Sequence, residues 1–204
     1  MSSNRSHWDS VYQDKSAQQL SWFQTEPKIS LNLIKHCGLD PDAALIDIGG
    51  GVSSLPRYLL ESGFTNISVL DISPTALQQA RKNLGADAGR VHWIEQDITG
   101  FTPPRSYALW HDRAVLHFLT QQQDQLAYRN SLKKALISGG FAIIASFAPD
   151  GPAQCSGLPV VQYDADRLKE LLGHEFELLQ QQDEIHTTPG GATQAFRYFL
   201  ITRV

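Results

Sequence analysis

Between residues 44 and 147, short apolar runs alternate with segments of helical periodicity, and this alternation constrains the fold more than any other feature of the chain. The pattern is typical of βαβ units, in which helices connect parallel strands. Two further apolar runs follow residue 175, separated by a turn-rich segment at residues 187–191. The sequence therefore predicts an α/β fold with a doubly wound sheet that is mostly parallel and ends in a C-terminal antiparallel hairpin.

Apolar runs and turn residues set the bounds of the expected elements. Ser73 and Pro74 predict a helix start and Gly85 its end. Further helices are expected over residues 123–137 and 165–172, and one is expected to begin near Ala114. The expected strands cover residues 44–48, 67–71, 91–95, 107–111, 141–147, 176–181 and 194–203.

Length and charge favour one soluble domain. The 204 residues suit a single α/β domain over residues 1–204, with a lid at 1–40, a core at 41–150 and an acceptor-side part at 151–204. Seventeen basic residues face 21 acidic ones without a long like-charge run, which disfavours nucleic acid as a partner. No apolar run approaches the roughly 20 residues that span a bilayer, so no membrane association is expected.

The chain has two cysteines, Cys37 and Cys155, which are far apart and form no CxxC pair. This usage disfavours a disulfide framework and predicts a cytoplasmic location with reduced thiols. Cys155 and His186 invite a metal hypothesis, but two ligands without a third do not make a site. We therefore expect no metal.

The strongest functional signal is a glycine-rich loop directly after the first expected strand. Residues 47–54 read DIGGGVSS, and an apolar helix with Leu55 and Leu59 follows. Glycines let the backbone turn sharply and let a ligand approach closely, although an ordinary strand-to-helix turn also uses them. Asp71 and Asp97 stand at the ends of the next two strands, where carboxylates suit a ribose and an adenine amine. A simple helix cap is the alternative role for each of these aspartates.

The segments ALIDIGGG, VLDIS, EQDI and WHDRAVLHFL resemble, in order and spacing, the motifs of class I S-adenosylmethionine-dependent methyltransferases, and the likeness extends over roughly residues 7–204. The resemblance implies a Rossmann-like seven-stranded fold with S-adenosylmethionine as the cofactor and S-adenosylhomocysteine as the product. This chain differs from those motifs in lacking the third loop glycine, since Ser54 stands at that position. The same difference argues against a nicotinamide dinucleotide-binding protein, because the GxGxxG motif of such proteins needs that glycine for close helix packing. The residues that the resemblance assigns to the cofactor are Trp22, Asp47, Gly49, Gly50, Gly51, Asp71, Ile72, Asp97, Ile98 and His111.

Large aromatic residues are concentrated before the first expected strand, at Trp8, Tyr12, Trp22 and Phe23. One interpretation places Trp8 and Tyr12, four residues apart, on the apolar face of a helix that packs on the core. The other is a lid that closes over the cofactor. The arrangement is similar to small bacterial methyltransferases and to eukaryotic methyltransferases that modify protein lysines.

No catalytic residue follows from the sequence, because in-line methyl transfer depends chiefly on alignment and a base is optional. The candidates are His117, Asp112 and His186. For His117 a structural hydrogen bond is an equal alternative, and for Asp112 a cap of the following helix. We expect His117, residues 155–158 and His186, taken as a loop residue of the hairpin, to line the acceptor pocket.

The leading hypothesis is a methyltransferase that acts on a small molecule. A protein lysine methyltransferase is the alternative among enzymes. A cofactor-binding or interaction protein that lacks catalysis is the alternative of another class.

Overall fold

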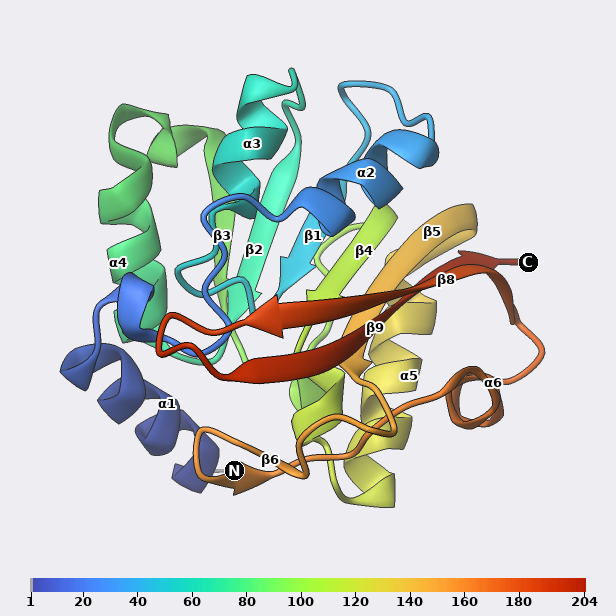
Figure 1. Ribbon diagram of the computed structural model, residues 1–204. Helices are drawn as coiled ribbons and strands as arrows, with labels where there is room; N and C mark the ends of the chain where they lie inside the picture. The colour runs from blue at the N-terminus through green and yellow to red at the C-terminus, as the bar shows by residue number, and fades with distance from the viewer. Residues whose placement is uncertain (1) are drawn as a thin grey trace.

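The computed structural model describes residues 2–204 and places seven strands in one sheet, in the order β3-β2-β1-β4-β5-β9-β8. Strands β1 to β5 pair in parallel, and β9 pairs antiparallel with both β5 and β8. Helices α2, α3 and α4 cover one face of the sheet, and α5 and α6 cover the other (Figure 1). The expected α/β fold with a C-terminal antiparallel hairpin is confirmed.

The elements have the following bounds. The strands of the main sheet are β1 (Leu45–Ile48), β2 (Ile67–Asp71), β3 (Val91–Glu95), β4 (Tyr107–Arg113), β5 (Leu136–Phe147), β8 (Phe176–Thr187) and β9 (Thr193–Arg203), and β6 (Gln154–Cys155) and β7 (Leu158–Pro159) form a separate small hairpin. The α-helices are α1 (Ser2–Asp14), α2 (Lys28–His36), α3 (Leu55–Glu61), α4 (Pro74–Leu84), α5 (Gln122–Ala135) and α6 (Ala165–Leu172).

The central parallel strands β1, β2 and β4 are buried on both faces, as a parallel sheet requires. On one face Leu33 of α2 and Leu59 of α3 pack in the same cluster as Val69 and Ile143 of the sheet. On the other face Leu132 of α5 and Leu168 of α6 pack in a second cluster. These two apolar layers fix the strand ends from which the functional side chains project.

Two helix starts follow from local hydrogen bonding. The Ser73 hydroxyl accepts the Ala76 N–H at 3.1 Å at the start of α4, and the Asp164 carboxylate accepts the Arg167 N–H at 2.8 Å at the start of α6. These caps satisfy N–H groups that have no partner inside the helix. Gly85 ends α4 with a φ of 63°, so the sequence prediction for this helix is correct.

Three strands are longer than the sequence predicts by two residues or more. Strand β4 continues to Arg113 because Asp112 pairs with Ile48 and Arg113 pairs with Ala145. Strand β5 begins at Leu136, which pairs with Tyr107 before an irregularity in the register, so the helix expected over residues 123–137 ends at Ala135. Strand β8 continues to Thr187 as an edge strand, and its polar residues 180–184 led to the shorter prediction.

The segment after β4 is also different from the expectation. In place of a helix near Ala114 there is a short 3-10 turn, Leu116–Phe118. Ala114 itself has a φ of 75°, in the left-handed region that alanine rarely adopts. Backbone strain of this kind is stored where neighbouring groups hold the chain in place.

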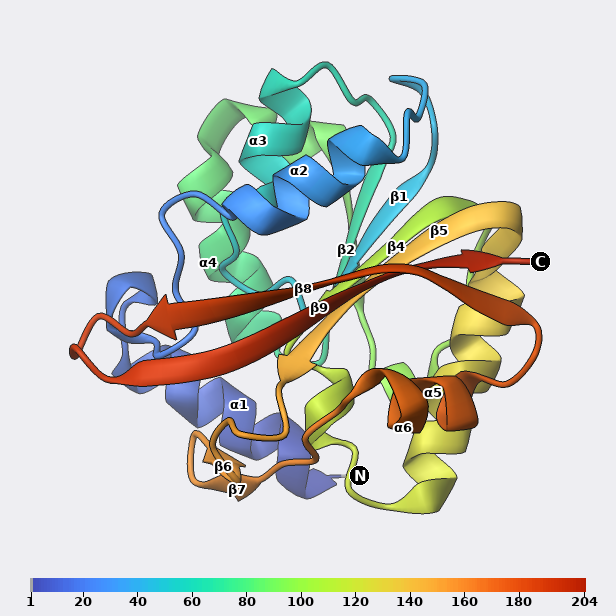
Figure 2. The same cartoon turned by 45° about the vertical axis from the view of Figure 1, so that its right-hand side comes forward.

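The parallel strands β1, β2 and β5 end at the side of the sheet where α1 and the β6–β7 hairpin lie (Figures 1 and 2). Segments from the start and the middle of the chain therefore meet at the carboxyl edge, which is the ligand-binding edge of open α/β sheets. No helix among residues 2–204 is long and apolar enough to cross a membrane.

Candidate cofactor and acceptor pocket

A cavity opens at the carboxyl edge of the sheet, between the ends of β1, β2 and β4 and the N-terminal segment. Nine of the ten residues that the family resemblance assigns to the cofactor line it. The lining residues are Asn4, Trp8, Tyr12, Leu20, Trp22, Phe23, Gln24, Pro27, Asp47, Ile48, Gly49, Gly50, Val52, Ser53, Ser54, Leu70, Asp71, Ile72, Gln96, Asp97, Ile98, His111, Arg113, Ala114, Val115, Phe118, Leu119 and Cys155.

The glycine-rich loop is tightly packed beside this cavity. Gly49 and Gly51 have φ values of 61° and 44°, which glycine adopts without strain. A Cβ on Gly49 would stand 2.1 Å from Cγ2 of Val115, and one on Gly51 would stand 2.5 Å from the Tyr12 hydroxyl oxygen. Gly49 borders the cavity, whereas Gly51 is not among the described residues that line it.

Asp71 ends β2 with its side chain in the cavity wall, and the residue is only 5% exposed. Its Oδ1 accepts the Ser73 N–H at 2.8 Å. Burial raises the pKa of Asp71 to about 7, although the backbone N–H groups of Ser73 and Gly51 act in the opposite direction. Further hydrogen-bond donors in the cavity, such as a pair of ribose hydroxyls, would stabilise the ionised form of this buried carboxyl group.

Asp97 follows β3 and lies beside the same cavity, as do Ile72 and Ile98. Its Oδ1 accepts both the N–H and the hydroxyl of Thr99, at 2.9 and 2.8 Å. Asp97 therefore caps the short turn that begins at Ile98, and both of these bonds use Oδ1. The capping and ligand-binding interpretations of this aspartate are compatible.

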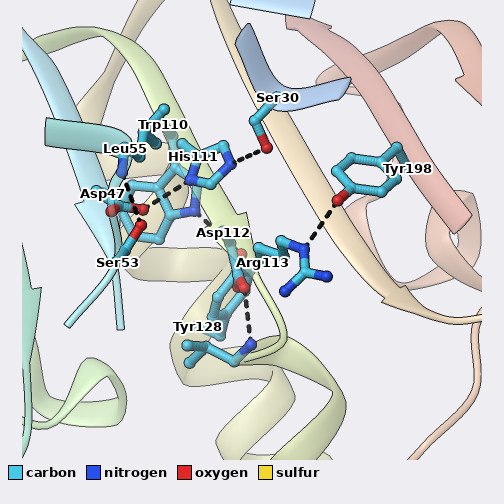
Figure 3. A network of polar contacts seen from close by, with 11 residues as sticks. Ser30, Asp47, Ser53, Leu55, Trp110, His111, Asp112, Arg113, Tyr128 and Tyr198 are labelled. Atoms are coloured by element: carbon cyan, nitrogen blue, oxygen red, sulfur yellow. Dashed lines mark hydrogen bonds and ion pairs between the residues drawn. The ribbon is translucent and has the colours of Figure 1, made fainter. Parts of the chain in front are cut away.

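His111 joins β4 to β1 and α2 through a buried chain of hydrogen bonds (Figure 3). Its Nδ1 lies 2.7 Å from Asp47 Oδ1, and its Nε2 lies 2.8 Å from the Ser30 hydroxyl. Both contacts are satisfied when Nδ1–H donates to Asp47 and the Ser30 hydroxyl donates to Nε2. Asp47 Oδ2 is buried and has no hydrogen-bond partner among the described residues. A cationic or N–H-bearing ligand group at the cavity wall would satisfy this oxygen.

The N-terminal aromatic residues serve as both packing and pocket wall. Trp8 packs edge-to-face on Trp22 and Phe118, with centroid distances of 5.8 and 4.9 Å. Tyr12 belongs to the same apolar cluster and lines the cavity with them. The same aromatic side chains therefore pack on the core and line the cavity.

Asp112 points to the face of β4 opposite to that of its neighbours His111 and Arg113. It is fully buried and is not among the described residues that line the cavity. Its carboxylate accepts the N–H groups of Val115 and Leu116, at 2.8 and 3.1 Å, and the Tyr128 hydroxyl at 2.7 Å. Burial raises the pKa of Asp112 to about 6 despite these donors. The side chain thus holds the strained turn at Ala114, which favours the capping interpretation over catalysis.

His117 is also fully buried and does not line the cavity that the described residues form. Its ring packs on Phe118 and Phe147, with centroid distances of 4.4 and 4.8 Å. Neither ring nitrogen has a hydrogen-bond partner among the described residues. Burial, with a smaller effect of Arg113, lowers the pKa of His117 to about 3. A base of this pKa takes up protons poorly at neutral pH, so this environment disfavours a catalytic role.

Replacing His117 with leucine tests this description. In the folded protein the pKa of His117 is below its unfolded value, so its contribution to stability is present above about pH 6.5 and is lost as the pH falls toward 3. Relative to His117→Leu, the wild type should lose about 2 kcal/mol of unfolding free energy between pH 7 and pH 5. Urea unfolding of both proteins at the two pH values measures this difference, and parallel pH profiles would contradict it.

His186 is a strand residue and not a loop residue, which corrects the sequence interpretation. It pairs with Gln194 within the β8–β9 hairpin, and its Nε2 lies 2.8 Å from the Ser21 carbonyl oxygen. It does not line the cavity described above. Cys155, by contrast, reaches the cavity wall from β6. Of His117, Cys155 and His186, only Cys155 is among the described residues that line this cavity, although Phe118, the neighbour of His117, also lines it.

Two residues of this region escaped the sequence analysis. Ser30 lies on the buried side of α2, and nothing in the sequence signals its bond to His111. Arg113 is the last residue of β4 and lines the cavity. A charged residue in the register of a buried strand was the available signal for Arg113.

Known proteins are similar to this chain in sequence and in fold. Residues 46–142 match the family model described as a methyltransferase domain. The eEF1A lysine and N-terminal methyltransferase of Mus musculus is 21% identical over 124 residues, which cover 60% of this chain and 18% of that protein. The chain thus spans about a fifth of the length of the first curated relatives it matches.

Solved structures cover nearly the whole chain. One, from work on the conversion of a disulfide bond into a thioacetal group during echinomycin biosynthesis, has a TM-score of 0.78 at 19% identity and covers 98% of this chain and 91% of its own. The 1,6-didemethyltoxoflavin-N1-methyltransferase of Burkholderia thailandensis, solved with 1,6-didemethyltoxoflavin and S-adenosylhomocysteine, has a TM-score of 0.68 at 19% identity. It covers 100% of this chain and 85% of its own. The family match and the seven-stranded fold agree: residues 46–142 form a methyltransferase domain, and the whole chain has the fold of class I S-adenosylmethionine-dependent methyltransferases.

Proposed function

We propose that this protein transfers the methyl group of S-adenosylmethionine to a small-molecule acceptor. The observation that carries the proposal is the cavity at the carboxyl edge, whose wall includes Asp47 and Gly49 together with the aromatic residues Trp8, Trp22 and Phe118. Helix α1 lies across this edge of the sheet (Figure 2). A covered, aromatic-lined cavity suits a small ligand better than an extended polypeptide.

The residues at the carboxyl edge fit the cofactor. In this proposal Asp71 binds the ribose hydroxyls, Asp97 binds the adenine amine, and Ile72 and Ile98 pack against the adenine ring. Asp47 Oδ2, which is buried without a partner among the described residues, would accept a hydrogen bond from the ammonium group of the methionine portion.

The methionine portion also requires close backbone approach. Gly49 and Gly50 line the cavity without a side chain, and the His111 backbone lies at the end of β4 beside them. Trp22 forms the facing wall. We assign these residues, with Gly51 as a packing residue behind them, to the methionine end of the site.

When bound, the cofactor supplies an electrophilic methyl group on a sulfonium centre. The chain's own task is to align an acceptor and to exclude water. Trp8, Trp22 and Phe118 would exclude water by their packing over the cavity. We assign no general base, because acceptors such as thiols and carboxylates ionise before attack and His117 is poorly suited to the role.

A protein lysine methyltransferase is the second candidate function, because the Mus musculus relative named above is a lysine and N-terminal methyltransferase. The net charge of −4 offers no electrostatic attraction to nucleic acid, so we do not propose a nucleic-acid acceptor.

Transfer of tritium from methyl-labelled cofactor into a fractionated cell lysate tests the proposal. Label in the low-molecular-mass fraction supports a small-molecule acceptor, whereas label in a protein band supports the lysine alternative. A protein that binds S-adenosylhomocysteine but transfers no label to either fraction would be a non-catalytic binding protein. Asp71→Ala, which should bind the cofactor weakly, is the control for label that does not depend on this site.

A further inference from the structure

Arg113 is the only lysine or arginine among the described residues that line the cavity. It is the last residue of β4, and its side chain is only 9% exposed. A buried guanidinium is costly unless its N–H groups find partners. The partners of its three guanidinium nitrogens therefore decide how well this charge is compensated.

Two of the three guanidinium nitrogens are held by the protein. Nε donates to the Tyr198 hydroxyl at 2.8 Å (Figure 3), and Nη1 donates to the Trp22 carbonyl oxygen at 2.9 Å. The guanidinium carbon lies 4.5 Å from the centre of the Phe196 ring. These contacts fix the plane of the guanidinium before any ligand binds, which lowers the entropy cost of binding one.

The third nitrogen, Nη2, is buried and has no hydrogen-bond partner among the described residues. Glu184 Oε2 lies 3.6 Å from it, beyond hydrogen-bond distance. Both Glu184 oxygens accept other bonds, from the Tyr198 hydroxyl at 3.0 Å and from Gln24 Nε2 at 2.8 Å. Glu184 therefore supports the arginine at ion-pair distance and leaves Nη2 without a hydrogen bond.

The position of Arg113 separates it from the adenosine end of the site. Asp71 ends β2 and Asp97 follows β3, both on one side of β1, whereas Arg113 ends β4 on the other side and bonds to β9. Cys155 borders the same part of the cavity, and burial raises the pKa of its thiol, which keeps it uncharged. No thiolate therefore competes for the arginine.

We propose that Arg113 binds a carboxylate of the methyl acceptor, so that the acceptor class is a small aromatic or apolar carboxylic acid. Nη2 supplies the unused charged donor, and Trp8, Trp22 and Phe118 supply the apolar contact. Charge-assisted hydrogen bonds of this kind are about twice as strong as neutral ones. The proposal rests on the proposed function, because it assumes that this end of the cavity holds the acceptor.

Binding to the protein saturated with S-adenosylhomocysteine tests it, with benzoate, phenylacetate and indole-3-acetate as probes and their amides as neutral counterparts. We expect at least one acid to bind the wild type roughly tenfold more tightly than its amide, about 1.4 kcal/mol. Arg113→Met should abolish that preference, and Arg113→Lys should restore part of it. Arg197→Met removes an arginine that pairs with Asp183 on the outer part of the hairpin, and it should keep the full preference.

Equal binding of acids and amides by the wild type, or no binding of any probe, overturns the proposal whether or not the variants fold. A second titration compares S-adenosylhomocysteine with methylthioadenosine, which lacks the amino-acid portion. If Arg113→Met weakens only the former, the arginine serves the cofactor's own carboxylate and the proposal is wrong. Failure of the wild type to bind S-adenosylhomocysteine would instead contradict the proposed function.

Discussion

Replacing Asp112 with alanine should lower the free energy of unfolding by about 3 kcal/mol or more, because buried donors that lose their partner cost about 1–3 kcal/mol each. The substitution removes the acceptor of Val115 N–H, Leu116 N–H and the Tyr128 hydroxyl. It also frees the turn that keeps Ala114 at a φ of 75°. Urea unfolding followed by tryptophan fluorescence measures the loss.

Asp166 provides the matched control, since it is an exposed acid on α6. Asp166→Ala should change the unfolding free energy by no more than about 0.5 kcal/mol. Asp112→Asn keeps the shape and one acceptor oxygen, so it should lie between the wild type and Asp112→Ala. A loss as small as that of the control would mean that Asp112 does not hold this turn.

Replacing Asp71 with alanine should weaken S-adenosylhomocysteine binding by about 1–3 kcal/mol, which is the cost of leaving ligand hydroxyls unpaired. The carboxylate is buried in the cavity wall, so in the variant bulk water does not readily reach the ligand hydroxyls that lose this partner. Calorimetric titration gives the affinity directly. Asp87→Ala, at an exposed acid paired with Arg90, should bind like the wild type.

The pH dependence of this binding gives a second readout. The ionised form of Asp71 accepts ribose hydroxyls, and burial raises its pKa to about 7. Affinity for S-adenosylhomocysteine should therefore decrease as the pH falls from 8 to 6, by up to about tenfold per pH unit below the pKa. Asp71→Asn should bind more weakly at pH 8 and depend less on pH. Identical pH profiles would show that Asp71 does not accept bonds from the ligand.

The sequence predicted the fold where local chemistry and long-range packing agree. The helix after Ser73 has a cap, a proline at its first position and a glycine stop, and the structure has all three features. Strand ends were predicted less well because pairing decides them. Arg113 and Asp112 extend β4 through partners on β1 and β5, which a local pattern does not reveal.

The candidate site shows the same division. Asp71 and Asp97 were predictable because carboxyl ends of parallel strands must meet at one edge. The sequence places His186 in a loop because the second half of β8 is polar and has no run of apolar residues. This half is nevertheless an edge strand, since it pairs with β9. Arg113 escaped because its partners, Tyr198 and the Trp22 carbonyl, are distant in sequence.

Calorimetric titration of the wild-type protein with S-adenosylhomocysteine and with NADH tests the central claim most directly. The glycine-rich loop, Asp71 and the unpartnered oxygen of Asp47 predict saturable binding of S-adenosylhomocysteine, and the same loop lacks the final glycine that a dinucleotide fingerprint needs. We expect one molecule of S-adenosylhomocysteine to bind per chain and NADH to give no binding heat. Binding of NADH without binding of S-adenosylhomocysteine would contradict the account.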